Sequence, residues 1–73
     1  MKLFLLKRID DSGWDVNNGF VVREENENAA RSRCSLERGD EGGGTWLSSE
    51  YSTCEEISPE GDPEILLTDF HAG

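Results

Sequence analysis

The chain has 73 residues, 34% of them hydrophobic and 32% charged, and its formal net charge at pH 7 is −9. This length allows one domain with a thin core, and the apolar content is too high for a disordered acidic tail. The negative charge argues against direct binding to DNA or RNA, because it repels their phosphates.

The net negative charge comes entirely from the second half of the chain. Residues 1–38 contain seven acidic and seven basic side chains and are neutral, whereas residues 39–73 contain nine carboxylates and no Lys or Arg. So many like charges on a small body cost stability through self-repulsion. Either they keep the protein soluble, or a basic partner uses them.

The sequence contains no sign of export or membrane insertion. The opening MKLFLLKR has four apolar residues between basic flanks, whereas a signal peptide needs an apolar region of at least about seven. No stretch approaches the roughly 20 apolar residues of a membrane span. We therefore expect an intracellular protein in which Cys34 and Cys54 are free thiols, with a Cys34–Cys54 bridge as the alternative.

Two strands are predicted in the first third of the chain. Residues 2–9 form an apolar run that ends at an Asp-Asp-Ser-Gly turn, and residues 19–23 are rich in β-branched and aromatic side chains. We expect the two strands to be antiparallel. Trp14 and Val16 could extend the pairing across a turn at Asn17, Asn18 and Gly19.

The main helix is predicted to begin after Asn26, a good N-cap residue, and to end near Arg38 with Gly39 beyond its last turn. Its weak apolar face consists of small residues and one larger side chain: Ala29, Ala30, Cys34 and Leu36. Such a helix can lie close to the sheet, with Cys34 as a small buried hydrophobic residue.

The elements after the main helix are predicted from glycines and prolines, which interrupt helices and strands, and from a helix-capping pattern. Residues 42–44 are three glycines and read as a flexible connection, and residues 45–47 return to the core. Ser52 and Glu55 form a capping box for a short helix over 52–57. Residues 59–63 form a Pro-bounded loop, and residues 64–70 read as a closing strand.

Together these elements predict an α+β fold, a small antiparallel sheet of about three strands with one long and one short helix, in a single domain over residues 1–73. Five apolar residues of the second half are expected to attach it to the core: Trp46, Ile57, Ile65, Leu67 and Phe70.

No catalytic or metal-binding motif is complete. The glycine triplet lacks the Lys of a phosphate-binding loop, and an EF-hand counted from Asp15 has Asn26 where a Glu is required. The lone histidine, His71, has no second His with which to hold a metal. We therefore expect no enzyme activity, no cofactor and no metal.

The carboxylates of the second half remain as the candidate site. Helix and strand spacings allow them to form a ridge of negative charges several ångströms apart, comparable to the phosphates along a DNA strand. Such a ridge would be attracted to a groove lined with Lys and Arg. The candidate partner-binding residues are Glu50, Glu55, Glu56, Glu60, Asp62, Glu64 and Asp69.

The chain resembles small acidic anti-CRISPR proteins encoded by bacteriophages, some of which inhibit type I Cascade-like complexes by occupying the DNA-binding site. The similarity lies in residues 1–8 (MKLFLLKR), 14–25 (WDVNNGFVVREE), 25–33 (ENENAARSR), Trp46, 52–57 (STCEEI) and 65–73 (ILLTDFHAG). The neutral residues 1–38 depart from a uniformly acidic mimic and indicate that only one face is used.

This resemblance implies a monomeric, non-enzymatic inhibitor in the cytoplasm of the host bacterium. Its partner would be a basic DNA-recognition surface of a Cas subunit, and the protein itself would bind neither nucleic acid nor membrane. Exposed Trp46 or Tyr51 could anchor the interface, although both are also candidates for the core. The alternative function is a phage adaptor that binds another host transcription or defence factor through a mixed surface.

Overall fold

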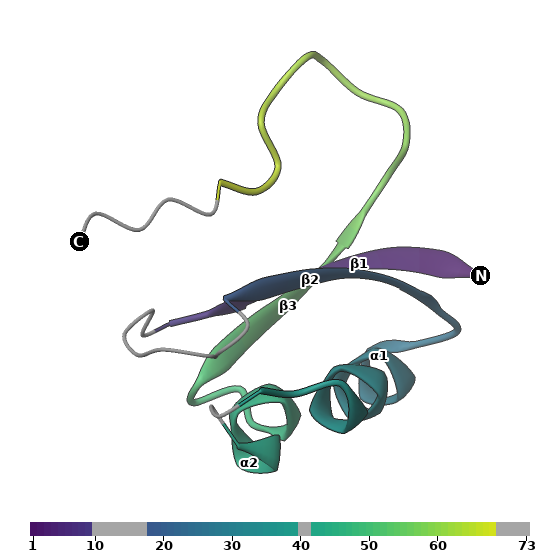
Figure 1. Cartoon of the computed structure of the whole chain (residues 1–73). Helices are drawn as coiled ribbons and strands as arrows, with labels where there is room; N and C mark the ends of the chain where they lie inside the picture. The colour runs from purple at the N-terminus through teal and green to yellow at the C-terminus, as the bar shows by residue number, and fades with distance from the viewer. Residues whose placement is uncertain (10–17, 40–41, 69–73) are drawn as a thin grey trace.

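The computed structural model describes residues 1–9, 18–39 and 42–68. Its elements follow in the order β1 (Lys2–Arg8), β2 (Gly19–Glu24), α1 (Glu27–Leu36), α2 (Gly43–Leu47) and β3 (Ser52–Ile57). The strands form one antiparallel sheet and both helices cover the same face of it, so the predicted α+β class is confirmed (Figure 1).

The first strand is central in the sheet, whose order is β2-β1-β3. Phe4 lies between Val22 of β2 and Glu56 of β3, and Leu5 lies between Val21 and Glu55. Since side chains alternate along a strand, these two rows point to opposite faces. The apolar run of β1 is buried on both faces of the sheet, since Phe4 and Leu6 lie under the helices and Leu5, on the opposite face, is only 1% exposed.

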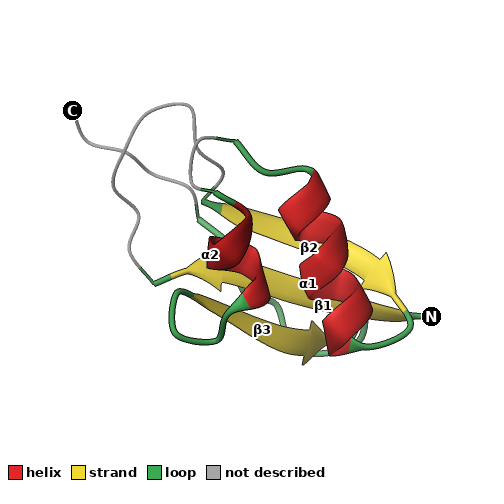
Figure 2. Ribbon diagram, turned by 90° about the horizontal axis from the view of Figure 1, so that it is seen from below, coloured by secondary structure: helices red, strands yellow, loops and turns green. Residues whose placement is uncertain are grey.

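The core lies between the sheet and the two helices. It contains six buried residues, and Phe20 and Cys54 pack against them: Phe4, Leu6, Val22, Ala30, Cys34 and Trp46. The ring of Phe20 meets that of Trp46 edge to face, with centroids 4.9 Å apart. As predicted, the small side chains of Ala30 and Cys34 are buried on α1, which allows this helix to lie close to the strands (Figure 2).

The predicted start of α1 is also confirmed. The side-chain oxygen of Asn26 accepts a hydrogen bond from the N–H of Ala29 at 2.8 Å, and Glu27 occupies the first turn. The helix ends at Leu36 with Glu37 as its C-cap, slightly before the predicted end. Leu36 itself is 81% exposed and does not belong to the apolar face.

The predicted helix over residues 52–57 is wrong, because this segment is β3. Its capping box does not form, since the Ser52 hydroxyl instead bonds to Arg31 and to backbone carbonyls of the α2 region. Thr53 and Ile57 are β-branched and favour a strand. The short helix of the fold is α2, which begins within the glycine triplet that was expected to be a flexible connection.

The predicted closing strand is not present in residues 64–68, the described part of that segment. The third strand of the sheet is β3 instead. Trp46 is fully buried and Ile57 and Leu67 are half-buried, but Ile65 is 82% exposed, so its assignment to the core is wrong. The predictions for Trp14, Val16, Asn17, Phe70 and His71 lie outside the described residues.

Candidate acidic binding surface

The third strand places two of the predicted site residues on opposite faces of the sheet. Glu55 lies opposite Leu5, on the face that the helices leave uncovered, which we call the outer side. Glu56 lies opposite Phe4 on the helix side. Both are exposed, and Glu56 is 3.8 Å from the Nζ of Lys2. A single ridge through both carboxylates therefore does not exist.

Three further carboxylates come together in the segment after β3, residues 58–64, which we call the acidic loop. Glu60, Asp62 and Glu64 are all exposed there. The N–H of Glu60 donates to the Ser58 hydroxyl at 3.1 Å, and Gly61 has a φ of 151°, which favours glycine. Figure 1 shows that this loop rises on the outer side of the sheet. Glu55 and the acidic loop thus share one side.

The other two predicted site residues do not join this group. Glu50 is exposed in the turn between α2 and β3, where its N–H donates to the Ser48 hydroxyl at 3.1 Å. Asp69 lies outside the described residues. The structure therefore gathers four of the seven predicted carboxylates on the outer side and separates Glu50 and Glu56 from them.

The outer side also carries positive charge near the sheet. Lys7 and Arg23 alternate with the helix-facing residues of β1 and β2, so both lie on the outer face. Arg33, by contrast, donates to the carboxylate of Glu24, and this hydrogen bond lowers the pKa of Glu24. The concentrated negative charge is thus the acidic loop with Glu55, and residues 42–68 contain no base to neutralise it.

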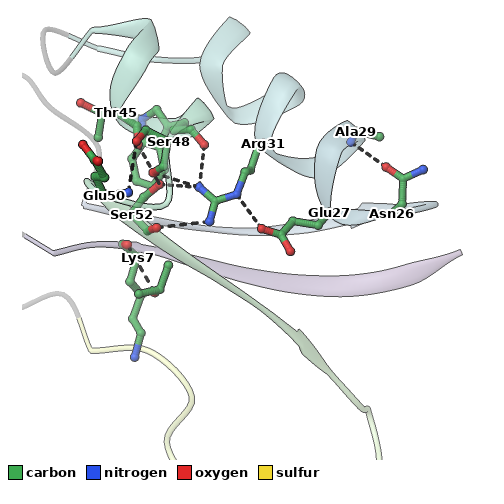
Figure 3. A network of polar contacts seen from close by, with 11 residues as sticks. Lys7, Asn26, Glu27, Ala29, Arg31, Thr45, Ser48, Glu50 and Ser52 are labelled. Atoms are coloured by element: carbon green, nitrogen blue, oxygen red, sulfur yellow. Dashed lines mark hydrogen bonds and ion pairs between the residues drawn. The ribbon is translucent and has the colours of Figure 1, made fainter.

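A buried arginine, whose role was not predicted from the sequence, holds the start of the strand that carries Glu55 and Glu56. The Nε of Arg31 donates to Glu27 at 2.8 Å. Its Nη1 donates to the carbonyls of Trp46 and Ser48 at 3.0 and 3.2 Å, and to the Ser52 hydroxyl at 2.9 Å. Its Nη2 donates to the Ser52 carbonyl at 3.2 Å. Arg31 therefore ties α1 to α2 and to the start of β3 (Figure 3).

One signal in the sequence points toward this network. Glu27 and Arg31 are four residues apart on one helix, a spacing that favours an ion pair. The spacing does not show that the guanidinium is buried, because that depends on carbonyls supplied by residues 46–52. The ion pair with Glu27 and the hydrogen bonds to residues 46–52 offset the cost of burying the Arg31 charge, and they hold the start of β3 against α2.

The cysteines are free thiols, as predicted; Cys34 is buried and Cys54 is half-buried. Burial raises the pKa of Cys34 to about 11, with a further increase from the nearby Cys54 and an opposing effect of Arg31. Burial also raises the pKa of Cys54. Both thiols therefore stay protonated near neutral pH, which makes them poor nucleophiles and poor metal ligands.

The two aromatic candidates for an interface anchor differ in exposure. Trp46 is fully buried, whereas Tyr51 is 59% exposed. The N–H of Ile9 donates to the Tyr51 carbonyl at 3.1 Å, and these two residues line a surface hollow of about 210 Å³ together with Glu50. Of the two aromatic residues, only Tyr51 can contact a partner.

No protein-family model matches the chain, and the comparisons with curated proteins and with solved structures also find no match. Among the described residues, no cluster of three or more His, Cys, Asp or Glu side chains could hold a metal ion. The helices in the same part of the chain are too short or too polar to cross a bilayer.

Proposed function

We propose that this protein is a non-enzymatic anti-CRISPR inhibitor that acts as a monomer in the cytoplasm of a host bacterium. Its outer side would bind a basic DNA-recognition surface of a type I Cas complex and block target DNA. The observation that supports this proposal is the gathering of Glu55, Glu60, Asp62 and Glu64 on one side of the sheet, in a segment without Lys or Arg.

The charge spacing supports the same proposal. Successive residues of an extended chain lie about 3.3 Å apart, and phosphates along one DNA strand contribute one charge per about 3.4 Å. Glu60, Asp62 and Glu64 are alternate residues of the acidic loop, so in an extended chain their charges would lie about 6.6 Å apart, which is about twice the DNA interval but still a regular row of negative charge. A surface of Lys and Arg that attracts DNA would attract this loop by the same long-range forces.

The test uses a purified type I surveillance complex and labelled target DNA. Excess wild-type protein should reduce the DNA bound to the complex, and the reduction should weaken as salt is raised. The variant with Glu55, Glu60, Asp62 and Glu64 all changed to Lys should not inhibit. If excess wild-type protein leaves DNA binding unchanged, the proposal fails for that complex. Cys54→Ser should inhibit like the wild type, because no thiol chemistry is involved.

A second candidate is an adaptor that binds another host transcription or defence factor through a mixed surface. The exposed Tyr51 favours it, since Ile9 and Glu50 lie beside this ring around one surface hollow. Buried aromatic anchors often dominate interfaces. In this case Tyr51→Ala would abolish partner binding, whereas charge reversal of the acidic loop would leave it intact.

A further inference from the structure

The hydrogen bonds near the end of the sheet determine which backbone groups of β3 point away from β1. The N–H of Ile9 donates to the carbonyl of Tyr51 at 3.1 Å, which continues the register of β1 and β3 by one position. In an antiparallel pair, hydrogen-bonded residues alternate with non-bonded ones. Residues 53, 55 and 57 therefore bond to β1, whereas the backbone groups of residues 52, 54 and 56 point outward.

Part of this outward row is already used inside the molecule. The N–H of Ser52 donates to the Ser48 carbonyl, and its own carbonyl accepts from Arg31, both at 3.2 Å. The N–H and C=O groups of Cys54 and Glu56 remain, and β3 is an edge strand of the sheet. In Figure 2 no described element lies beyond β3 on this edge. We call these four groups the β3 edge.

The charges beside the β3 edge favour one kind of occupant. Glu55 projects to the outer side and Glu56 to the helix side, and β3 itself contains no base; the exposed Lys2 of β1 lies 3.8 Å from Glu56. If a second copy paired through its own β3, carboxylates would lie near carboxylates, which is unfavourable. An added strand with two consecutive basic residues would instead place one base against each carboxylate.

We propose that the β3 edge accepts an extended segment with two consecutive Lys or Arg residues as a fourth strand. Backbone hydrogen bonds to Cys54 and Glu56 would supply affinity, and the ion pairs with Glu55 and Glu56 would select the basic sequence. This inference rests on the proposed function, because the segment belongs to the basic partner. The backbone hydrogen bonds to β3 would add a directional contact to the long-range attraction of the acidic loop.

The first experiment uses the acetylated peptide Thr-Val-Lys-Arg-Val-Thr as the probe. The controls are two peptides with the same sequence and charge. One is N-methylated at its odd-numbered residues and the other at its even-numbered residues, so each lacks the N–H donors along one edge of the extended peptide. The parent peptide should slow amide hydrogen exchange at Cys54 and Glu56, and at least one methylated peptide should bind more weakly. Equal binding of all three peptides, or no binding of the parent, would overturn strand addition.

The second experiment changes the protein and keeps the peptide. Glu56→Pro removes one outward N–H and one charge, Glu56→Gln removes only the charge, and Val21→Pro removes an outward N–H from the opposite edge strand. Proline is tolerated where the replaced N–H points to solvent. Glu56→Pro should bind the parent peptide about two- to tenfold more weakly than Glu56→Gln, as expected for one hydrogen bond, and Val21→Pro should bind like the wild type. Equal affinities of both Glu56 variants would contradict the proposal.

These outcomes are separable from a failure of the proposed function. Inhibition of DNA binding that survives in Glu56→Pro, together with failure of the peptide tests, would leave the acidic loop as the binding element and remove only the strand contact. Peptide binding without any inhibition would retain the β3 edge and overturn the role of the protein at a DNA-recognition surface.

Discussion

The two sides of the sheet are built differently. On the helix side, six residues form a closed core in which Trp46 is fully buried. On the outer side Leu5 is buried, but Val21 is 55% exposed and Leu66 is 41% exposed. The helix side therefore provides most of the stability, and the outer side can change its surface residues with little effect on the fold.

Charge follows the same division. The one buried charged residue of the described chain, Arg31, has five hydrogen bonds to side chains and carbonyls of α1, α2 and β3. The carboxylates of the acidic loop are exposed, and solvent screens them. The buried charge of Arg31 thus connects elements of the fold, whereas the exposed carboxylates described on the outer side make no such connection and are available to solvent or to a partner.

Trp46→Ala should produce the largest loss of stability, because it removes the side chain that fills the space between the helices and the sheet. We expect a loss of about 3–5 kcal/mol in the free energy of unfolding, measured by urea denaturation followed by circular dichroism. Ile65→Ala on the outer side should change it by less than about 0.5 kcal/mol. Similar losses in both variants would contradict the contrast between the two sides.

Arg31→Met should be next, with a loss of about 3 kcal/mol. Methionine keeps much of the aliphatic volume but removes the guanidinium hydrogen bonds to the carbonyls of Trp46, Ser48 and Ser52. Arg33→Met is the matched control, because the Arg33 side chain is 62% exposed and solvent screens its ion pair with Glu24, so its loss should be much smaller. The same urea experiment measures both, and equal effects would show that burial of Arg31 is unimportant.

Alkaline pH should weaken the helix side through Cys34. Its pKa is about 11 in the folded protein and 9.0 ordinarily, so the unfolded chain loses this proton first as the pH rises. The contribution of Cys34 to stability should be constant below pH 9 and should decrease between pH 9 and about 11 by at most about 2–3 kcal/mol. Thermal melts across this range should show a smaller decrease for Cys34→Ala. An identical pH dependence in both proteins would exclude Cys34 as the cause.

Charge reversal in the acidic loop should have the smallest effect on stability. Glu60→Lys with Asp62→Lys removes repulsion among exposed carboxylates, so the free energy of unfolding should stay within about 0.5 kcal/mol of wild type or increase slightly. Urea denaturation at low salt provides the measurement. A loss above about 1 kcal/mol would show that the loop acids stabilise the fold.

The first half of the fold could be predicted because its signals are local. The apolar run of β1, the β-branched residues of β2 and the Asn26 cap each determine their own element. In the second half, the capping box at Ser52 competes with strand formation, and the result depends on Arg31, which lies 21 residues earlier in the chain. Such a long-range contact leaves no pattern in a single sequence.

The candidate site was predictable to the same extent. The acidic character of the second half follows from counting residues, but its division between sides depends on whether 52–57 is a helix or a strand. In a strand, Glu55 and Glu56 separate to opposite faces. The exposure of Tyr51 and the burial of Trp46 likewise follow from packing, since both residue types occur in cores and in interfaces.

Two double charge reversals with the same change in net charge test most directly whether the outer side is a binding surface. One is Glu60→Lys with Asp62→Lys in the acidic loop, and the other is Glu25→Lys with Glu37→Lys at the two ends of α1. Both are measured by displacement of labelled target DNA from a type I surveillance complex. The loop variant should need at least about tenfold more protein for the same displacement, and the α1 variant should stay within about twofold of wild type. Equal losses in both would show that net charge alone acts and would contradict a binding surface on the outer side.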